Sequence, residues 1–168
     1  MNTVKSRVIA VTGKGGTGKT ALVVIMVKIL ARDKRLKLLA IDADSASSLP
    51  QTLGVKVDKT VNDIREEFIK NPEARSRLAD THIRTVIGNI VKQEGGINLL
   101  VMGRPEGAGC FCSVNDLLRY GIETLSRDFA VTIVDGEAGP EQINRRVLES
   151  VDTLIIVADA SIRSMQTA

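Results

Sequence analysis

Short runs of aliphatic residues alternate along the chain with longer segments in which apolar and polar residues recur at helical spacing. The runs are rich in Val, Ile and Leu, and their short length is typical of buried strands. Strands that alternate with helices indicate an α/β fold, in which a mainly parallel sheet carries helices on both faces. The predicted strands are residues 7–12, 36–41, 97–102, 131–134 and 153–158.

The intervals between these runs predict helices. We expect a break at Gly88 within one of them, and a cap at Ser113 before another. A single domain over residues 1–168 is expected. Because the chain stops about ten residues after the last predicted strand, in what looks like the start of a helix, we expect this domain to be C-terminally incomplete. The predicted helices are residues 18–32, 61–70, 74–93, 113–128 and 141–150.

Composition narrows the classes of function. With three Phe, one Tyr and no Trp, the core must consist of Val, Ile, Leu and Ala, which suits parallel strands buried on both faces. The net charge of +3 is spread among acids, with no basic run interleaved with aromatics, so no nucleic-acid partner is expected. The longest apolar stretch, residues 21–30, is interrupted by Lys28 and too short to span a bilayer. With no recognisable signal peptide, these features predict a cytoplasmic protein with no membrane partner.

Residues 13–20 match the phosphate-binding pattern G-x-x-x-x-G-K-[ST], between a predicted strand and a predicted helix. Glycines let backbone N–H groups curl around a phosphate, and the helix adds its positive N-terminal end. Lys19 is expected to reach the β and γ phosphates, and the Thr20 hydroxyl to bind Mg²⁺. The alternative is a glycine-rich turn that binds nothing. The residues expected to wrap the phosphates are Gly13, Gly15, Gly16, Thr17 and Gly18.

Carboxylates follow two of the predicted strands. Asp42 and Asp44 come after the second strand, and Asp135 ends the fourth. Because ligands bind at the carboxyl ends of parallel strands, Asp135 is predicted to hold Mg²⁺ and Asp42 to support its ligand shell. The alternative is that these acids cap turns. Gly139 is expected to place a backbone N–H near the γ phosphate.

Cys110 and Cys112 are the complete cysteine inventory. In an extended segment, residues two apart point to the same side, so both thiolates could approach one soft metal ion. Two ligands do not complete a tetrahedral site, but a twofold dimer would supply four sulfurs. The alternative is two ordinary buried residues.

The motif K-G-G-T-G-K-T resembles the deviant phosphate loop of the P-loop ATPase family that includes MinD, ParA and the nitrogenase iron protein. This resemblance implies ATP as the nucleotide, a homodimer in which Lys14 reaches the partner's phosphates, and an Asp44 that positions the attacking water. Two positions depart from the family pattern, with Ala21 in place of a second hydroxyl residue and Ser45 in place of proline.

Two further segments, M-G-R-P-E-G-A-G-C-F-C-S-V-N and V-D-G-E-A-G-P-E-Q, resemble the CooC group of nickel-insertion accessory ATPases within that family. This resemblance implies that Cys110 and Cys112 hold Ni²⁺ or Zn²⁺ across the dimer. It also implies a nickel enzyme as client, such as carbon monoxide dehydrogenase or acetyl-CoA synthase.

The sequence therefore leads to the hypothesis of an ATP-hydrolysing metallochaperone, with Lys14, Lys19 and Asp44 as catalytic residues. Two alternatives stay open. One is a MinD/ParA-like positioning ATPase that acts on membrane or DNA, and the other is a nucleotide-binding dimerisation switch with negligible turnover.

Overall fold

The computed structural model describes residues 6–44, 46–73, 80–104, 112–136 and 151–160. Within these ranges six strands form one sheet in the order β3-β4-β2-β5-β1-β6. Every neighbouring pair is parallel except β3 and β4, so the predicted mainly parallel sheet is confirmed. The strands are β1 Arg7–Gly13, β2 Leu38–Asp42, β3 Lys92–Glu94, β4 Ile97–Val101, β5 Val131–Asp135 and β6 Thr153–Val157.

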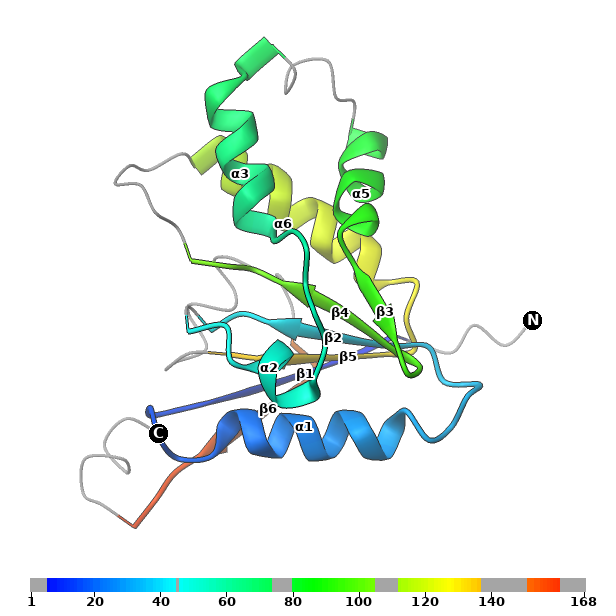
Figure 1. The fold of residues 1–168 in the computed structure, drawn as a ribbon, viewed down its shortest axis with the longest axis vertical. Coiled ribbons are helices and arrows are strands. Elements are labelled where there is room, and N and C mark those ends of the chain that lie inside the picture. Colours follow the sequence, from blue (N-terminus) through cyan, green and yellow to red (C-terminus); the bar gives the residue numbers. More distant parts are fainter. Residues whose placement is uncertain (1–5, 45, 74–79, 105–111, 137–150, 161–168) are drawn as a thin grey trace.

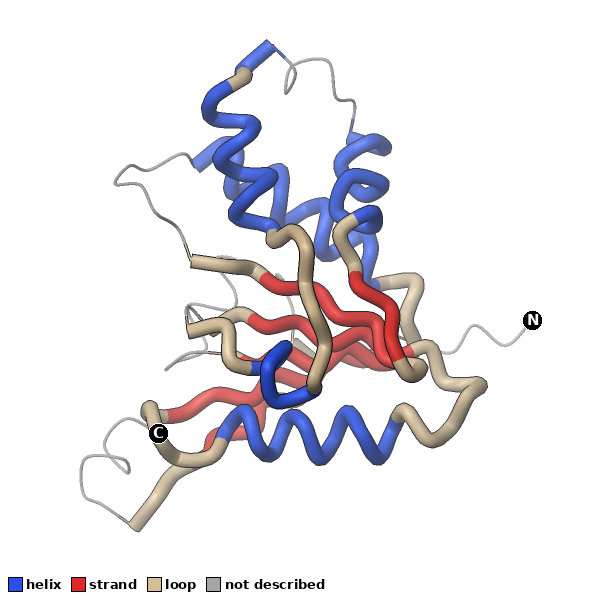
Figure 2. The backbone as a smooth tube through the Cα atoms, viewed as in Figure 1, coloured by secondary structure: helices blue, strands red, loops and turns tan. Residues whose placement is uncertain are grey.

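Helices cover both faces of this sheet, as predicted. Figure 1 shows α1 on one face and α3, α5 and α6 on the other, and Figure 2 shows the strands as one layer between them. The short helix α2 lies beside α1. The helices are α1 Lys19–Leu30, α2 Leu49–Leu53, α3 Val61–Lys70, α5 Asp80–Asn89 and α6 Cys112–Ser126.

The central strand β2 shows how the apolar runs build two cores. All of its residues are buried. Leu39 and Ile41 join the core under α3, α5 and α6, whereas Leu38 and Ala40 join the core under α1 and α2. A strand with both faces covered needs apolar residues at successive positions, which explains the continuous apolar run in the sequence.

Two local predictions were wrong. Residues 92 and 93, expected at the end of a long helix, belong to β3, and the helix ends at Asn89. Gly95 and Gly96 both have positive φ angles, of 60° and 89°, as a two-residue turn between antiparallel strands requires. Cys112, expected in an extended segment, is the first residue of α6. The predicted helix over residues 141–150 lies outside the described residues.

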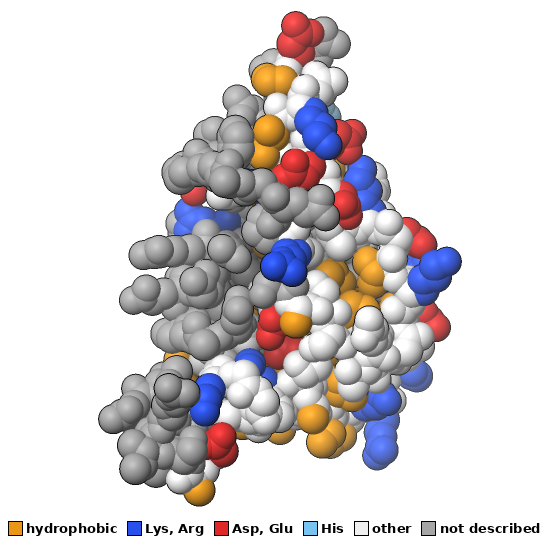
Figure 3. Space-filling model, turned by 60° about the vertical axis from the view of Figure 1, so that its left-hand side comes forward, with side chains coloured by type: hydrophobic (Ala, Val, Ile, Leu, Met, Phe, Trp, Pro, Cys, Tyr) orange, Lys and Arg blue, Asp and Glu red, His pale blue; other side chains and the backbone are white. Residues whose placement is uncertain are grey.

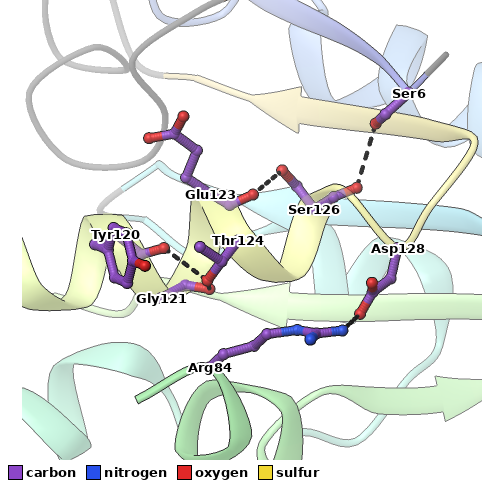
Figure 4. A network of polar contacts seen from close by, with 8 residues as sticks. All are labelled: Ser6, Arg84, Tyr120, Gly121, Glu123, Thr124, Ser126 and Asp128. Carbon is purple, nitrogen blue, oxygen red and sulfur yellow. Dashed lines mark hydrogen bonds and ion pairs between the residues drawn. The ribbon is translucent and has the colours of Figure 1, made fainter. Parts of the chain in front are cut away.

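The C-terminal end of α6 is fastened to two neighbours (Figure 4). Arg84 of α5 forms an ion pair with Asp128, just past the helix end. The Ser6 hydroxyl donates to the carbonyl of Ser126 at 3.3 Å, and the Ser126 hydroxyl donates to the carbonyl of Glu123 at 2.8 Å. The end of α6 is thereby tied to α5 and to the start of β1.

Close packing of α5 on α6 predicts a large difference between two glycine substitutions. A Cβ at Gly121 would lie 3.0 Å from Ile83 Cγ1 and 3.1 Å from Ile87 Cγ1, whereas one at Gly88 would meet only Leu125 Cδ1, at 3.8 Å. We expect Gly121→Ala to lower the free energy of unfolding by about 1–3 kcal/mol, because the helices must move apart. Gly88→Ala should raise it by up to about 1 kcal/mol through helix propensity. Urea unfolding of both variants checks this, and equal effects would contradict it.

The described surface mixes charges of both signs. On the face that Figure 3 shows, acidic and basic side chains are interspersed.

The helix α1 is apolar nearly all round, and its Ile25 and Ile29 are exposed. None of the helices in the described ranges has the length and hydropathy needed to cross a bilayer.

Candidate functional site

The predicted phosphate loop has open space beside three of its glycines. Gly13, the last residue of β1, passes so close to β6 that a Cβ on it would lie 2.1 Å from the carbonyl oxygen of Val157. Gly16 and Gly18 have positive φ angles of 84° and 90°, which residues with side chains rarely adopt. A Cβ at Gly15, Gly16 or Gly18 would meet nothing within 4 Å. The loop is therefore an open cradle of backbone groups.

The helix α1 begins inside this cradle. Its N-cap residue, Gly18, offers no side-chain acceptor to the first backbone N–H groups, which leaves them to an anion. Lys19 is 7% exposed, and its Nζ donates to the carbonyl oxygen of Lys14 at 3.2 Å. The Thr17 hydroxyl donates to the same oxygen at 2.8 Å. Lys19 thus curls back over the loop, with its positive charge at the place predicted for a phosphate.

Two buried aspartates lie side by side on neighbouring strands close to the phosphate loop. Asp42 of β2 and Asp135 of β5 are paired in register and fully buried. Asp42 accepts backbone hydrogen bonds from Leu49 N at 3.0 Å and Asp44 N at 3.1 Å. Both carboxylate oxygens of Asp135 are buried and have no hydrogen-bond partner of standard geometry among the described residues, although the Thr20 hydroxyl lies close enough to lower the pKa of Asp135. Buried carboxylates without partners are costly, and oxygen ligands are the ones Mg²⁺ prefers, so these residues fit a magnesium ion.

The raised pKa values of Asp42 and Asp135 also fit a cation site. Burial raises the pKa of Asp42 to about 7, against the effect of its two backbone hydrogen bonds, and the charges of Asp135 and Asp44 add to the rise. Burial also raises the pKa of Asp135, and the negative charge of Asp44 adds to this rise. The nearby Thr20 hydroxyl and the positive charge of Lys19 lower the pKa and so oppose the rise. A divalent cation between the carboxylates would offset the cost of their charge.

The raised pKa of Asp42 makes stability depend on pH. The unfolded carboxyl titrates near 3.8 and the folded one near 7, so between these values only the folded state keeps the proton. The free energy of unfolding of the nucleotide-free protein should therefore fall as pH rises through this window, by at most roughly 4 kcal/mol. Urea unfolding across the window should show a smaller slope for Asp42→Asn than for the wild type. An unchanged slope would contradict the assignment, and Asp58→Asn, an exposed acid, is the control.

The loop after β2 adds a residue that the sequence reasoning missed. Thr20 Oγ1 lies 3.3 Å from Ser48 Oγ. Ser48 is the N-cap of α2, and Pro50 lies in the first turn of that helix. Within the same loop Asp44 Oδ1 accepts from Ala46 N at 2.9 Å, and Ser47 has a positive φ of 47°. The Ser-Leu-Pro pattern is a helix-start signal that could have revealed α2 and placed Ser48 near the site.

The structure brings most of the predicted site residues together at the carboxyl ends of the central strands. These residues are the phosphate loop, Thr20, Asp42, Asp44 and Asp135. Gly139 and Cys110 lie outside the described residues, and for Cys112 the structure describes only the backbone, at the start of α6. Within the described ranges, no three His, Cys, Asp or Glu side chains form a group that could hold a metal ion. A magnesium site here would therefore need Thr20 and the phosphates as further ligands.

Two known proteins align with almost the entire chain. An uncharacterised ATP-binding protein of Methanocaldococcus jannaschii is 46% identical over 165 residues, which cover 96% of this chain and 65% of the relative. The carbon monoxide dehydrogenase accessory protein CooC of Rhodospirillum rubrum is 32% identical over 173 residues, which cover 95% of this chain and 65% of CooC. The chain thus spans about two thirds of the length of these relatives.

Solved structures share the fold at lower identity. An ATP complex of Cyanothece McdA superposes with a TM-score of 0.68 at 20% identity, covering 97% of this chain and 60% of McdA. The septum site-determining protein MinD of Pyrococcus horikoshii, in complex with Mg-ADP, gives 0.62 at 21% identity, covering 97% of this chain and 62% of MinD. The family model described as the CobQ/CobB/MinD/ParA nucleotide binding domain matches residues 8–165. The chain therefore belongs to the CobQ/CobB/MinD/ParA family of nucleotide-binding domains.

Proposed function

We propose that this protein is an ATP-hydrolysing metallochaperone, which dimerises with nucleotide and assists nickel insertion into carbon monoxide dehydrogenase or acetyl-CoA synthase. The observation that carries the hydrolytic half is the pair of buried aspartates beside the open N-terminus of α1. Family membership and relatives named for ATP support ATP with Mg²⁺ as the bound species.

In this proposal, backbone N–H groups and Lys19 bind the phosphates, and oxygen-bearing side chains bind the magnesium ion. The backbone of residues 13–18 and the first turn of α1 bind the phosphates, and Lys19 neutralises charge on the β and γ phosphates. Thr20, Asp135 and Asp42 hold Mg²⁺, which when bound neutralises charge that develops on the phosphate oxygens.

Hydrolysis requires a water in line with the bond that breaks. Asp44, in the turn after β2, orients that water toward the γ phosphorus while the bond to ADP breaks. Lys14 reaches the phosphates of the partner subunit and adds positive charge there. We further propose that Gly139, which lies outside the described residues, uses its backbone N–H to sense release of the γ phosphate.

Metal delivery rests on the cysteine segment. Cys110 and Cys112 supply two thiolates, and a homodimer brings four to one Ni²⁺ or Zn²⁺ ion. The 32% identity to CooC of Rhodospirillum rubrum, together with the C-x-C segment, supports this role and a nickel enzyme in the cytoplasm as the client.

Replacing both cysteines tests the metal half of the proposal. We expect wild-type dimers to bind about one Ni²⁺ or Zn²⁺ ion, and Cys110→Ser with Cys112→Ser to bind almost none, because serine is a poor ligand for soft metals. Metal content per dimer by elemental analysis is the measurement. His82→Ala, which removes the sole histidine, is the control and should leave the content unchanged. Equal metal in wild type and double variant would exclude the cysteines as ligands.

Activity assays separate the remaining alternatives. Release of inorganic phosphate by the purified protein excludes a switch with negligible turnover. Co-sedimentation with lipid vesicles or DNA that requires ATP would instead favour a positioning ATPase.

A further inference from the structure

The N-terminus of α3 is held by a capping box. Thr60, its N-cap, accepts a hydrogen bond from Asp63 N at 3.3 Å, and the Asp63 carboxylate accepts from Thr60 N at 2.7 Å. This capping box satisfies two of the backbone donors at the helix start. The first turn of α3 therefore has a defined position against the loop that precedes it.

Backbone hydrogen bonds join this first turn to Asp42, at the carboxyl end of β2. Met102, just after β4, donates its N–H to the carbonyl of Asp42 at 2.8 Å, and its own carbonyl accepts from Asn62 N of α3 at 2.9 Å. The next residue, Gly103, has a φ of 75°, and a Cβ on it would lie 2.6 Å from Thr60 Oγ1. Asp42 is therefore connected to the start of α3 through two backbone hydrogen bonds and the close contact of Gly103.

One turn further along α3, a buried arginine reaches the start of α6. Arg65 is 9% exposed, and its Nε donates to Asn115 Oδ1 at 3.1 Å. Its Nη1 pairs with Glu66 at 3.0 Å. Asn115 lies in the first turn of α6, three residues after Cys112. Breaking a hydrogen bond to a buried guanidinium leaves a buried donor unsatisfied, so this contact constrains the two helices more than an exposed ion pair does.

We propose that Arg65 is a positioning residue, which acts through Asn115 to hold the N-terminal turn of α6, and Cys112 with it, in a fixed position relative to Asp42 and the phosphate loop. The inference rests on the proposed function, because it assumes that Cys112 binds metal. Through α3, the path runs from Asp42 to Met102, Asn62, Arg65 and Asn115. Nucleotide bound at one end then changes metal affinity at the other, and thermodynamic linkage requires metal to change nucleotide affinity by the same factor.

A merely structural role makes a different prediction. A contact that only holds α3 against α6 would change stability and leave the effect of nucleotide on metal affinity intact. The ion pair of Arg84 with Asp128 provides the comparison, because it fastens the opposite end of α6 with both side chains about half exposed. Its loss should alter neither metal affinity nor the coupling.

The experiment measures Ni²⁺ affinity of the full chain with and without a magnesium complex of a non-hydrolysable ATP analogue. The variants are Asn115→Leu, which removes the acceptor, Asn115→Asp, which keeps an oxygen for the guanidinium, and Arg84→Gln as control. We expect Asn115→Leu to bind Ni²⁺ about 10–100-fold more weakly and to lose the response to nucleotide. Asn115→Asp and Arg84→Gln should retain both. If Asn115→Leu does not fold, Asn115→Ser, too short to reach Arg65, replaces it.

The outcomes separate the two claims. A wild type that binds no Ni²⁺ through its cysteines defeats the metallochaperone proposal, and the role of Arg65 falls with it. A wild type that binds Ni²⁺ in a nucleotide-dependent manner, with Asn115→Leu unchanged in affinity and response, leaves the chaperone intact and overturns the role of Arg65. Lower stability of Asn115→Leu with an unchanged response also overturns it, because that is the signature of a purely structural contact.

Discussion

Replacing Lys19 by alanine should lower the kcat of ATP hydrolysis by about a thousandfold. The Lys19 side chain is 7% exposed, and among the described residues its ammonium donates a hydrogen bond to the carbonyl oxygen of Lys14. A phosphate that displaces this carbonyl would bring a full negative charge to the ammonium. That interaction strengthens as charge builds on the γ phosphate, so its loss affects the transition state more than the ground state.

The same measurement should distinguish three lysines. Lys28→Ala, on the exposed side of the last turn of α1, should leave kcat unchanged and serves as the matched control. Lys14→Ala should lower turnover while nucleotide binding is largely kept, because Lys14 is proposed to act on the partner's phosphates. Phosphate release and nucleotide titration, with thermal unfolding to confirm the fold, give the answer. Turnover that survives in Lys19→Ala would show that the loop is not the catalytic phosphate site.

The central sheet and the phosphate loop were predictable because both depend on local signals. A strand such as β2, covered on both faces, must read as an unbroken apolar run. The loop follows a fixed spacing, because the backbone of the glycines and the lysine must reach the phosphates while the hydroxyl reaches the magnesium ion. The bounds of α3, predicted as residues 61–70, agree with the structure, since a Thr-x-x-Asp capping box marks its start.

Short elements and long-range contacts were not predictable in the same way. The helix α2 and the strand β3 are too short to show a period, and the turns beside them decide their conformation. The hydrogen bond of Arg65 to Asn115 joins residues 50 apart in sequence, so no local sequence pattern predicts it. Likewise, the raised pKa of Asp42 depends on burial and on the neighbouring strand, which exist only in the folded sheet.

Asp135→Asn should stabilise the nucleotide-free protein and abolish hydrolysis at the same time. In the wild type both oxygens of Asp135 are buried without a hydrogen-bond partner of standard geometry among the described residues, and burial raises its pKa against the opposing effects of Thr20 and Lys19. A neutral amide removes the cost of that charge, so the free energy of unfolding at neutral pH should rise by about 1–3 kcal/mol. Hydrolysis should fall by about a thousandfold, because Asp135 is proposed to be a magnesium ligand.

The pair of effects distinguishes a functional carboxylate from a structural one. If Asp135 were needed for the fold, its replacement would lower stability and activity together. A site that keeps an unpartnered charge for a cation instead gains stability when the charge is removed, and loses the further stability that bound magnesium nucleotide confers. Urea unfolding with and without magnesium nucleotide measures both, with Asp58→Asn, an exposed acid paired with Lys92, as control. A less stable Asp135→Asn variant that still responds to magnesium nucleotide would exclude Asp135 as a magnesium ligand.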